Sequence, residues 1–138
     1  MYIEIIQNIN KDIKEGAVFN ETGIIGQVVN NKSFYEVMLL TDTKSSIPLT
    51  NSKGDFYCNA SGSGASDYIT CSYSQLVWLD NHELGEKFFS SGLGGIYPKG
   101  IEIGNLESKK IIDPSTTLLK IKLISNPLHS NLFGVIKL

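Results

Sequence analysis

The sequence predicts an all-β protein built of short strands. Its 138 residues include 13 glycines and 41% hydrophobic residues, which is enough apolar content for one packed domain or for two small barrels that share an interface. The apolar residues fall in short groups separated by glycine, asparagine and proline, the pattern of strands and tight turns. No stretch shows the apolar period of a helix longer than about two turns. Together these observations favour small β-barrels.

Short strands separated by polar turns are expected along the whole chain. Apolar residues alternate imperfectly over 2–7, and a polar stretch leads to a second expected strand over 16–19. Asn20-Glu21-Thr22-Gly23 has the composition of a hairpin turn, because asparagine and glycine tolerate the backbone angles of such turns. Further strands are expected over residues 24–29, 35–40, 46–49, 75–79, 118–123 and 132–136.

One predicted hairpin carries both cysteines. Strands over 56–59 and 69–73 flank a flexible turn, and a register that pairs Ala60 with Ile69 also sets Cys58 directly opposite Cys71. Directly opposed residues at a non-hydrogen-bonded site lie close enough for a disulfide. Two buried free thiols are the alternative, and both outcomes stay open because the residues themselves do not determine the redox compartment.

A glycine-rich corner lies between two of the later strands. Residues 85–107 hold six of the thirteen glycines, with Phe88-Phe89 before the corner and Ile101 and Ile103 after it. Glycine allows the positive φ of a sharp reversal, so we expect strand, corner and strand, with the corner buried against the body of the second barrel. Phosphate binding is not expected, because the dinucleotide and P-loop spacings are both missing. The expected turn residues are Gly92, Gly94, Gly95, Pro98, Gly100 and Gly104.

Charge and apolar content exclude several classes of protein. The formal net charge is −2 at pH 7 and lysine and arginine form no cluster, whereas nucleic-acid binding needs a basic stripe. Acidic lipid headgroups are disfavoured for the same reason. The sequence has no apolar run of about 18 residues and no basic start followed by an apolar core, so it shows neither a membrane helix nor a signal peptide. Taken alone, these features indicate a cytosolic protein.

No set of side chains assembles into an expected active site. A serine hydrolase needs a nucleophile, a histidine base and a carboxylate together, and the candidates are Ser91, His82 and Asp80. Nine extended residues span up to about 30 Å, which sets the histidine and the serine far apart. His129 is interpreted as a solvated turn residue, and the cysteine spacing does not fit a zinc site. We therefore expect no catalytic residue, no metal and no cofactor.

Two blocks of sequence carry a family resemblance. The first is Gly85-Glu86, then Ser90-Ser91-Gly92-Leu93, then the stretch from Gly95 to Gly104; the second lies upstream, over 23–28, 37–42 and 46–49. In this order they resemble the signature of the extracytoplasmic domain of the MreC family, the bacterial rod-shape-determining proteins. Glu86, Ser90 and Tyr97 stand where Asp, Thr and Phe are usual in the family. The resemblance covers about residues 15–136.

The resemblance implies a fold and a location. It implies two compact β-barrels, the first distantly similar in topology to one barrel of the trypsin-like proteases. Residues 1–138 would then be one extracytoplasmic domain of two interleaved or tandem sub-barrels, on the periplasmic side of the inner membrane. The family's N-terminal membrane helix and coiled-coil stalk are expected to be absent from this chain, with Met1 an expression start. An oxidising periplasm would favour the Cys58–Cys71 disulfide.

The resemblance also implies a function. It implies a non-catalytic scaffold of the peptidoglycan elongation machinery that maintains cell shape by binding the elongation-specific penicillin-binding transpeptidase. Other membrane proteins of the rod complex and a second copy of the domain, in a dimer or filament, are further expected partners. Nucleic acid and small-molecule substrates are not expected. The alternative is a β-barrel serine protease or a degenerate relative of one.

Strand parity predicts the partner-binding residues. Successive side chains alternate between the two faces of a strand, so if Phe88 points into a barrel, Phe89 points outward. The same alternation on the cysteine hairpin sets Tyr57 and Tyr68 on the face opposite the cysteines. Because interfaces are enriched in aromatic residues, we expect Phe89, and then Tyr57 and Tyr68, to contact the partner. The alternative is that both faces are covered within the barrels.

Overall fold

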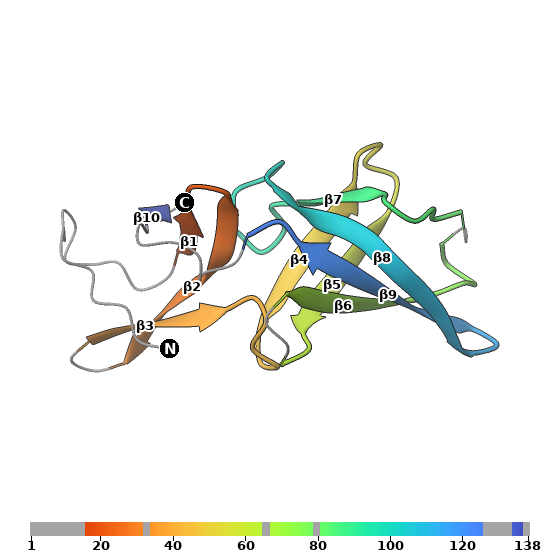
Figure 1. The fold of residues 1–138 in the computed structure, drawn as a ribbon, viewed down its shortest axis with the longest axis horizontal. Helices are drawn as coiled ribbons and strands as arrows, with labels where there is room; N and C mark the ends of the chain where they lie inside the picture. The colour runs from red at the N-terminus through yellow and green to blue at the C-terminus, as the bar shows by residue number, and fades with distance from the viewer. Residues whose placement is uncertain (1–15, 32–33, 65–66, 79–80, 126–133, 137–138) are drawn as a thin grey trace.

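The computed structural model describes residues 16–31, 34–64, 67–78, 81–125 and 134–136. Within these ranges the chain forms strands and turns, which confirms the all-β class (Figure 1). None of the residues described belongs to a helix long and apolar enough to cross a membrane. The strands are β1 (Ala17–Asn20), β2 (Gly23–Asn31), β3 (Phe34–Leu39), β4 (Ser46–Asn51), β5 (Tyr57–Gly62), β6 (Tyr68–Ser74), β7 (Lys87–Ser90), β8 (Glu102–Asp113), β9 (Thr116–Leu123) and β10 (Gly134–Ile136).

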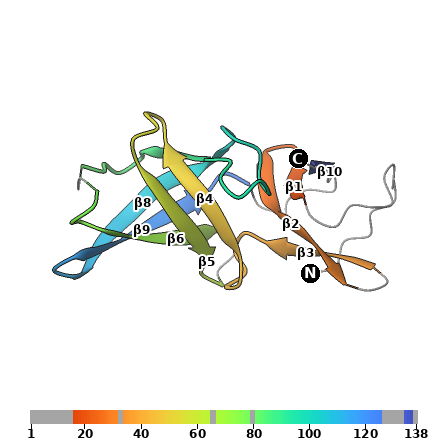
Figure 2. The same cartoon turned by 180° about the vertical axis from the view of Figure 1, so that it is seen from behind.

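The strands form two units that lie side by side (Figures 1 and 2). β4, β5, β6, β9, β8 and β7 close in that order into a barrel, while β10, β1, β2 and β3 form a four-stranded sheet. All of these pairings are antiparallel. Two small barrels were expected from the family resemblance. In the part of the chain that is described, one is a closed barrel and the other unit is the sheet.

Alternating burial explains why the barrel strands form. In β4 the buried residues Ile47 and Leu49 alternate with exposed or half-buried ones, and β6 buries Ile69, Cys71 and Tyr73 in the same way. The burial pattern of β9 repeats this alternation. Because successive side chains point to opposite faces of a strand, a period of two sends one face of each strand into the barrel core.

One hydrophobic core runs through both units. Ala17 and Ile24 of the sheet and Leu40, which follows β3, pack in one cluster with the buried residues of the barrel. At the same junction the hydroxyl of Tyr97 donates a hydrogen bond to Oε1 of Gln27 in β2, at 3.2 Å. Barrel and sheet therefore form one continuous body.

The cysteine hairpin contains the disulfide, in a register that differs from the predicted one. Ala60 pairs with Cys71 and Gly62 with Ile69, so the predicted pairing of Ala60 with Ile69 is wrong by two residues. Cys58 therefore lies diagonally across from Cys71, with 6.2 Å between the Cα atoms, and a disulfide joins them. A shift of two residues keeps every side chain on its face, so apolar alternation could not distinguish the two registers.

β8 extends beyond the barrel at the end remote from the sheet. It pairs with β7 only as far as Asn105 but with β9 as far as Asp113. Residues 107–113 are exposed and, with the start of β9, project as a two-stranded arm (Figure 1). At the tip the N–H and hydroxyl of Ser115 donate to Oδ1 of Asp113 at 2.8 and 3.0 Å, and these bonds hold the pKa of that carboxyl below its ordinary value.

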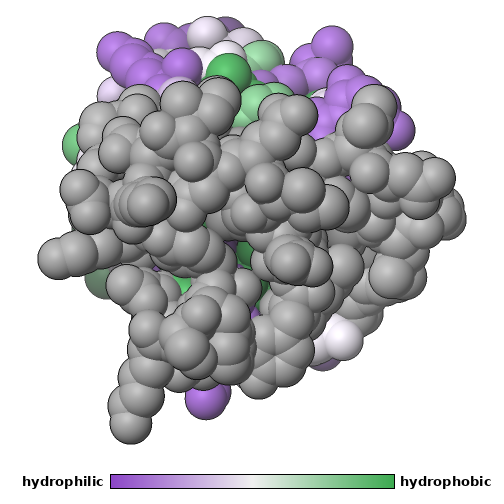
Figure 3. All heavy atoms as spheres, turned by 90° about the vertical axis from the view of Figure 1, so that its left-hand side faces the viewer, coloured by the Kyte–Doolittle hydropathy of each residue, from purple (hydrophilic) through white to green (hydrophobic). Residues whose placement is uncertain are grey.

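The first and last described strands lie together in the sheet. Ala17 at the start of β1 pairs with Ile136 at the end of β10. Figure 3 looks onto this sheet end, where the visible described surface mixes hydrophilic and hydrophobic residues. We call the opposite end of the molecule, with the β8–β9 arm, the distal end. The strand expected over 2–7 and both Asp80 and His129 lie outside the described residues.

Candidate partner-binding surface

The glycine-rich corner has the backbone that its sequence predicted. Its positive φ angles, from 73° to 85°, belong to Gly92, Gly94, Gly95 and Gly100. Only glycine adopts such angles without a Cβ clash. The N–H of Ser90 donates to the carbonyl of Ile101 at 2.8 Å, and its hydroxyl accepts from the N–H of Ile101 at 3.0 Å and donates to the carbonyl of Pro98. These bonds close the corner onto the end of β7.

Two predictions about the corner are wrong. Gly94, Gly95 and Gly100 lie on the surface, so the corner is not buried as a whole, and what it buries is the ring of Tyr97. Gly104 is not a turn residue but lies inside β8, where a Cβ atom would lie 2.1 Å from the carbonyl oxygen of Lys122 in β9. Gly104 therefore serves the close approach of two strands rather than a reversal of the chain.

Tyr97 connects the corner to the sheet. Its side chain is 1% exposed and its hydroxyl donates to Gln27 of β2. Burial raises the pKa of the Tyr97 phenol well above its ordinary value, because the phenolate would lose its hydration. A neutral buried phenol with one hydrogen-bond acceptor fits a structural role.

His82 is buried in an aromatic cluster at the distal end. Its Nδ1 lies 2.6 Å from Oε2 of Glu86, and its ring centroid lies 4.3 Å from that of Phe56. The backbone carbonyl of His82 accepts a hydrogen bond from Nζ of Lys109 at 2.9 Å. These contacts attach the segment before β7 to the side of β8.

The hydrolase candidates are not brought together. His82 precedes β7 and Ser91 follows it, so the strand separates them. The hydroxyl of Ser91 accepts from the N–H of Leu93 at 3.3 Å, and His82 is engaged with Glu86. Among the residues described, no three His, Cys, Asp or Glu side chains gather as metal ligands. The remaining candidate for a functional site is an exposed surface that could bind a partner protein.

Three connections make up the distal end of the barrel. They are residues 52–56 between β4 and β5, residues 75–78 and 81–86 between β6 and β7, and residues 114–115 between β8 and β9. The N–H of Gln75 donates to the carbonyl of Ser115 at 2.9 Å, which holds the second and third connections together. Antiparallel neighbours in a closed barrel bring alternate connections to the same end, so these segments lie beside one another.

Exposed apolar side chains gather at this end. We define the distal patch as Leu76, Val77, Leu84, Ile111, Ile112 and Tyr57, whose side chains are 85%, 71%, 69%, 64%, 54% and 43% exposed. Such a group of large apolar residues is a feature of interaction sites, whereas single exposed apolar residues are ordinary. Strand parity pointed to Tyr57 alone among these residues.

The strand expected over 75–79 explains why the patch was missed. The structure forms a turn over residues 75–77, so this prediction is wrong in the part of the segment that is described. A strand would have buried either Leu76 or Val77, whereas the turn exposes both. The spacing of apolar residues cannot distinguish a short apolar turn from a short apolar strand. The residues of this segment therefore gave no signal that it forms a turn.

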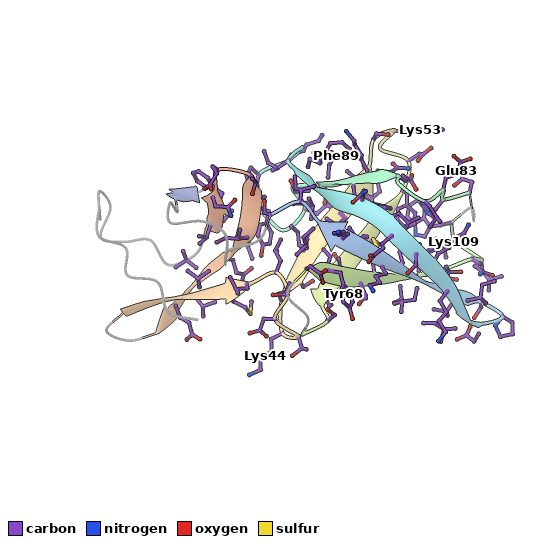
Figure 4. The ribbon with its side chains drawn as sticks, viewed as in Figure 1. Lys44, Lys53, Tyr68, Glu83, Phe89 and Lys109 are labelled. Atoms are coloured by element: carbon purple, nitrogen blue, oxygen red, sulfur yellow. A yellow bond between two sulfur atoms is a disulfide. The ribbon has the colours of Figure 1, made fainter. Side chains whose placement is uncertain are left out.

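The three predicted contact residues lie on different strands of the barrel, and Figure 4 shows Phe89 and Tyr68 apart from each other. Phe88 is fully buried and Phe89 half-buried, as strand parity predicted. Tyr57 is exposed at the distal end, but Tyr68 begins β6 at the other end, with Nζ of Lys120 4.1 Å from its ring centroid. Two strands separate β7 from β6 in either direction around the barrel. Phe89, Tyr57 and Tyr68 therefore do not form one continuous surface.

Comparison with known proteins assigns the chain to a family. The model of the family described as rod shape-determining protein MreC, barrel core, matches residues 5–136. The chain belongs to the MreC family. The cell shape-determining protein MreC of Haemophilus influenzae is 33% identical over 106 residues, which are 72% of this chain and 30% of that protein. The MreC of Escherichia coli is 28% identical over 95 residues, 68% of this chain and 25% of that protein. The chain thus spans less than a third of the length of these relatives.

Solved MreC structures share the fold. The crystal structure of MreC from Pseudomonas aeruginosa superposes with a TM-score of 0.76 at 22% identity, over 88% of this chain and 78% of that one. A complex between penicillin-binding protein PBP2 and MreC from Helicobacter pylori contains a chain that superposes with a TM-score of 0.68 at 16% identity, over 94% of this chain and 81% of that one. At these identities the likeness concerns the fold.

The residues that carry the MreC resemblance are structural in this chain. The stretch from Ser90 to Gly104 forms the corner, its hydrogen bonds and the close approach of β8 to β9. The distal patch lies at the opposite end of β7 from this corner. The contacts of this stretch therefore account for its signature residues through the fold.

Proposed function

We propose that this chain is a non-catalytic scaffold domain of the bacterial cell-wall elongation machinery, and that it binds the elongation-specific penicillin-binding transpeptidase. The observation that carries the proposal is the match of the MreC barrel core to residues 5–136. Its relatives are named for determining cell shape, and one protein of the same fold forms a complex with a penicillin-binding protein. Binding would take place on the extracytoplasmic side of the inner membrane.

The structure supports a binding role through its rigidity. A closed barrel, a core shared with the sheet and a disulfide between β5 and β6 leave little freedom to be lost on association, which favours affinity. The serine protease alternative gains no support from the positions of Ser91 and His82, since β7 separates them and the His82 ring is buried against Phe56. A scaffold needs a preformed surface and no reacting group.

The proposal extends to further partners and to particular residues. Other membrane proteins of the rod complex and a second copy of the domain remain proposed partners, and one relative of the same fold is described as a filament. Of the contact residues proposed from the sequence, Phe89, Tyr57 and Tyr68, we retain Tyr57, because the three do not form one continuous surface. Tyr57 is the most exposed of the three.

Direct binding to the purified transpeptidase tests the proposal. We expect the immobilised domain to bind the transpeptidase in biolayer interferometry and to retain it from detergent-solubilised cell envelope. A β-barrel domain of similar size and net charge is the control bait. A purified transpeptidase that fails to bind the domain would contradict the proposal. Labelling of Ser90 or Ser91 by a fluorophosphonate probe would contradict the non-catalytic role.

A further inference from the structure

The residues of the distal patch lie on neighbouring segments at one end of the barrel. Gln75 precedes Leu76 and Val77, and its backbone bond to Ser115 brings them beside the arm that carries Ile111 and Ile112. The side-chain amide of Gln75 also donates to the hydroxyl of Thr117, the residue paired with Ile111 across the arm. The patch is therefore assembled from two separate segments by hydrogen bonds that hold them in place.

The remaining two members, Leu84 and Tyr57, lie near the same segments. Lys109 in the arm holds the carbonyl of His82, two residues before Leu84. The ring of Tyr57 lies 6.3 Å from that of Trp78, the residue after Val77. In Figure 4 Lys109 and Glu83 lie toward the end of the barrel remote from the sheet.

A rigid layer of aromatic rings lies beneath the patch. The centroid of Phe56 lies 5.4 Å from that of Trp78, 5.2 Å from that of Tyr73 and 4.3 Å from that of His82. Phe56, Tyr73 and His82 are buried. Packed rings hold the backbone of the segments that carry Tyr57 and Val77, which lowers the entropic cost of association.

The position of the patch limits what could cover it. β1 begins and β10 ends in the sheet, at the end of the molecule opposite the patch (Figure 1). The exposed charges around the patch, Glu83, Lys110 and Asp113, have both signs. Mixed charge does not suit the uniformly negative surface of a nucleic acid or an acidic membrane. It suits the polar rim of a protein interface with an apolar centre.

We propose that the distal patch is the surface through which this domain binds the penicillin-binding transpeptidase. This inference rests on the function proposed above and adds the place of contact. The matching surface of the transpeptidase would be apolar at its centre, with charges of both signs at its edge. Tyr57 is then the aromatic contact at the centre, and Phe89 and Tyr68 lie outside the interface.

Substitutions that remove apolar surface without disturbing the core test this location. Leu76→Ser with Val77→Ser changes two side chains of a turn, and Ile111→Ser changes one in the exposed arm. Leu93→Ser is the matched control, because Leu93 is 58% exposed but lies in the corner at the other end of β7. Phe89→Ala tests the assignment made from strand parity. Melting curves establish that each variant folds before binding is measured.

The outcomes separate the location from the function. We expect the distal variants to bind the purified transpeptidase about tenfold more weakly or worse, with Leu93→Ser and Phe89→Ala close to wild type. If the wild-type domain binds and the folded distal variants bind equally well, the location is wrong while the proposed function stands. If Phe89→Ala is the only variant that loses binding, the location is likewise wrong and the proposed function stands. If the wild-type domain does not bind at all, the function and the location both fail. If the distal variants change only self-association in ultracentrifugation, the patch belongs to a second copy and the inference is overturned.

Discussion

Tyr97 places a weakly acidic hydroxyl inside the protein. Its ring is buried between the corner and the sheet, and its hydroxyl bonds to Gln27. Removal of the phenolate from water raises the pKa of Tyr97 in the folded state. In the unfolded chain the phenol keeps its ordinary pKa of about 10. The two states therefore bind different numbers of protons in alkaline solution.

We predict that the free energy of unfolding falls as the pH rises above about 10. In that range the unfolded state has released the Tyr97 proton while the folded state retains it, so alkali favours unfolding, and below it both states hold the proton. The slope due to one such group approaches about 1.4 kcal/mol per pH unit. Urea unfolding over about pH 9–11 measures it, with Tyr97→Phe expected to lose this part of the slope and Tyr68→Phe to retain it. Equal slopes in wild type and Tyr97→Phe would contradict the assignment.

Glycine shows how far single residues could be understood from the sequence. The cluster at 92–100 predicted positive φ angles because several glycines and a proline in close succession are typical of tight turns, and the structure has those angles. The role of Gly104 could not be predicted, because it depends on the carbonyl of Lys122, which only the pairing of β8 with β9 brings near. The need for glycine in a turn can be read from the neighbouring residues. The need for glycine opposite another strand cannot, because it depends on which strands pair.

At the scale of elements, the disulfide extends the contact between β5 and β6 beyond their paired residues. We call the boundary between these two strands the seam. The two strands share only three residue pairs, from Ala60–Cys71 to Gly62–Ile69, although β5 begins at Tyr57. Cys58 lies beyond the last of these pairs, so its bond to Cys71 holds the seam where the ladder has ended. The covalent bond thus takes the place of backbone hydrogen bonds at the distal end of the seam.

Removal of this bond should weaken the protein and loosen the seam. We predict that Cys58→Ser with Cys71→Ser lowers the free energy of unfolding by about 2–4 kcal/mol, because the unfolded chain regains the freedom of a closed loop. Amide hydrogen exchange should rise most in residues 57–59 and 72–74. Reduced wild-type protein should behave like the double variant, and Ser61→Ala, an exposed neighbour on β5, should match untreated wild type. An unchanged urea midpoint after complete reduction would refute the prediction.

The faces of the strands were predictable, while their register was not. The alternation that set Phe88 inward and Tyr57 outward is confirmed by their burial. The register of the cysteine hairpin is decided by turn geometry, since the buried set stays the same after a shift of two residues. The prediction of a nearby pair of cysteines was therefore more robust than the register on which it depended.

At the scale of the whole molecule, the shared core should make unfolding cooperative. Ala17, Ile24 and Leu40 pack with the barrel residues, so the sheet cannot open without exposing one side of the barrel core. We predict a single transition in which Trp78 fluorescence, which reports on the barrel, and a Phe19→Trp reporter in β1 share one urea midpoint. Phe19 is half-buried, so the larger ring has room at the surface. A sheet reporter that changes at lower urea would show that the units unfold separately.

The arrangement of the molecule was only partly contained in its sequence pattern. The strands and the family signature indicated two compact units, and the closed barrel is one of them. The distal patch arises from the start of β5, the connection between β6 and β7 and the end of β8, which are far apart in sequence and are brought to one end by the order of strands around the barrel. That order is a property of the closed barrel, so the pattern of a single segment could not place Leu76 beside Ile111.

The pairing of Ala17 with Ile136 also determines how the molecule would carry mechanical load. β1 begins and β10 ends at the same end of a ladder that continues through Val18–Val135 and Phe19–Gly134. Force applied where the chain enters β1 and leaves β10 would open these pairs one after another, like a zipper, and would not shear them together. The barrel lies off the path between the two points of attachment. Tension along the chain would therefore detach β10 first and reach the distal patch last.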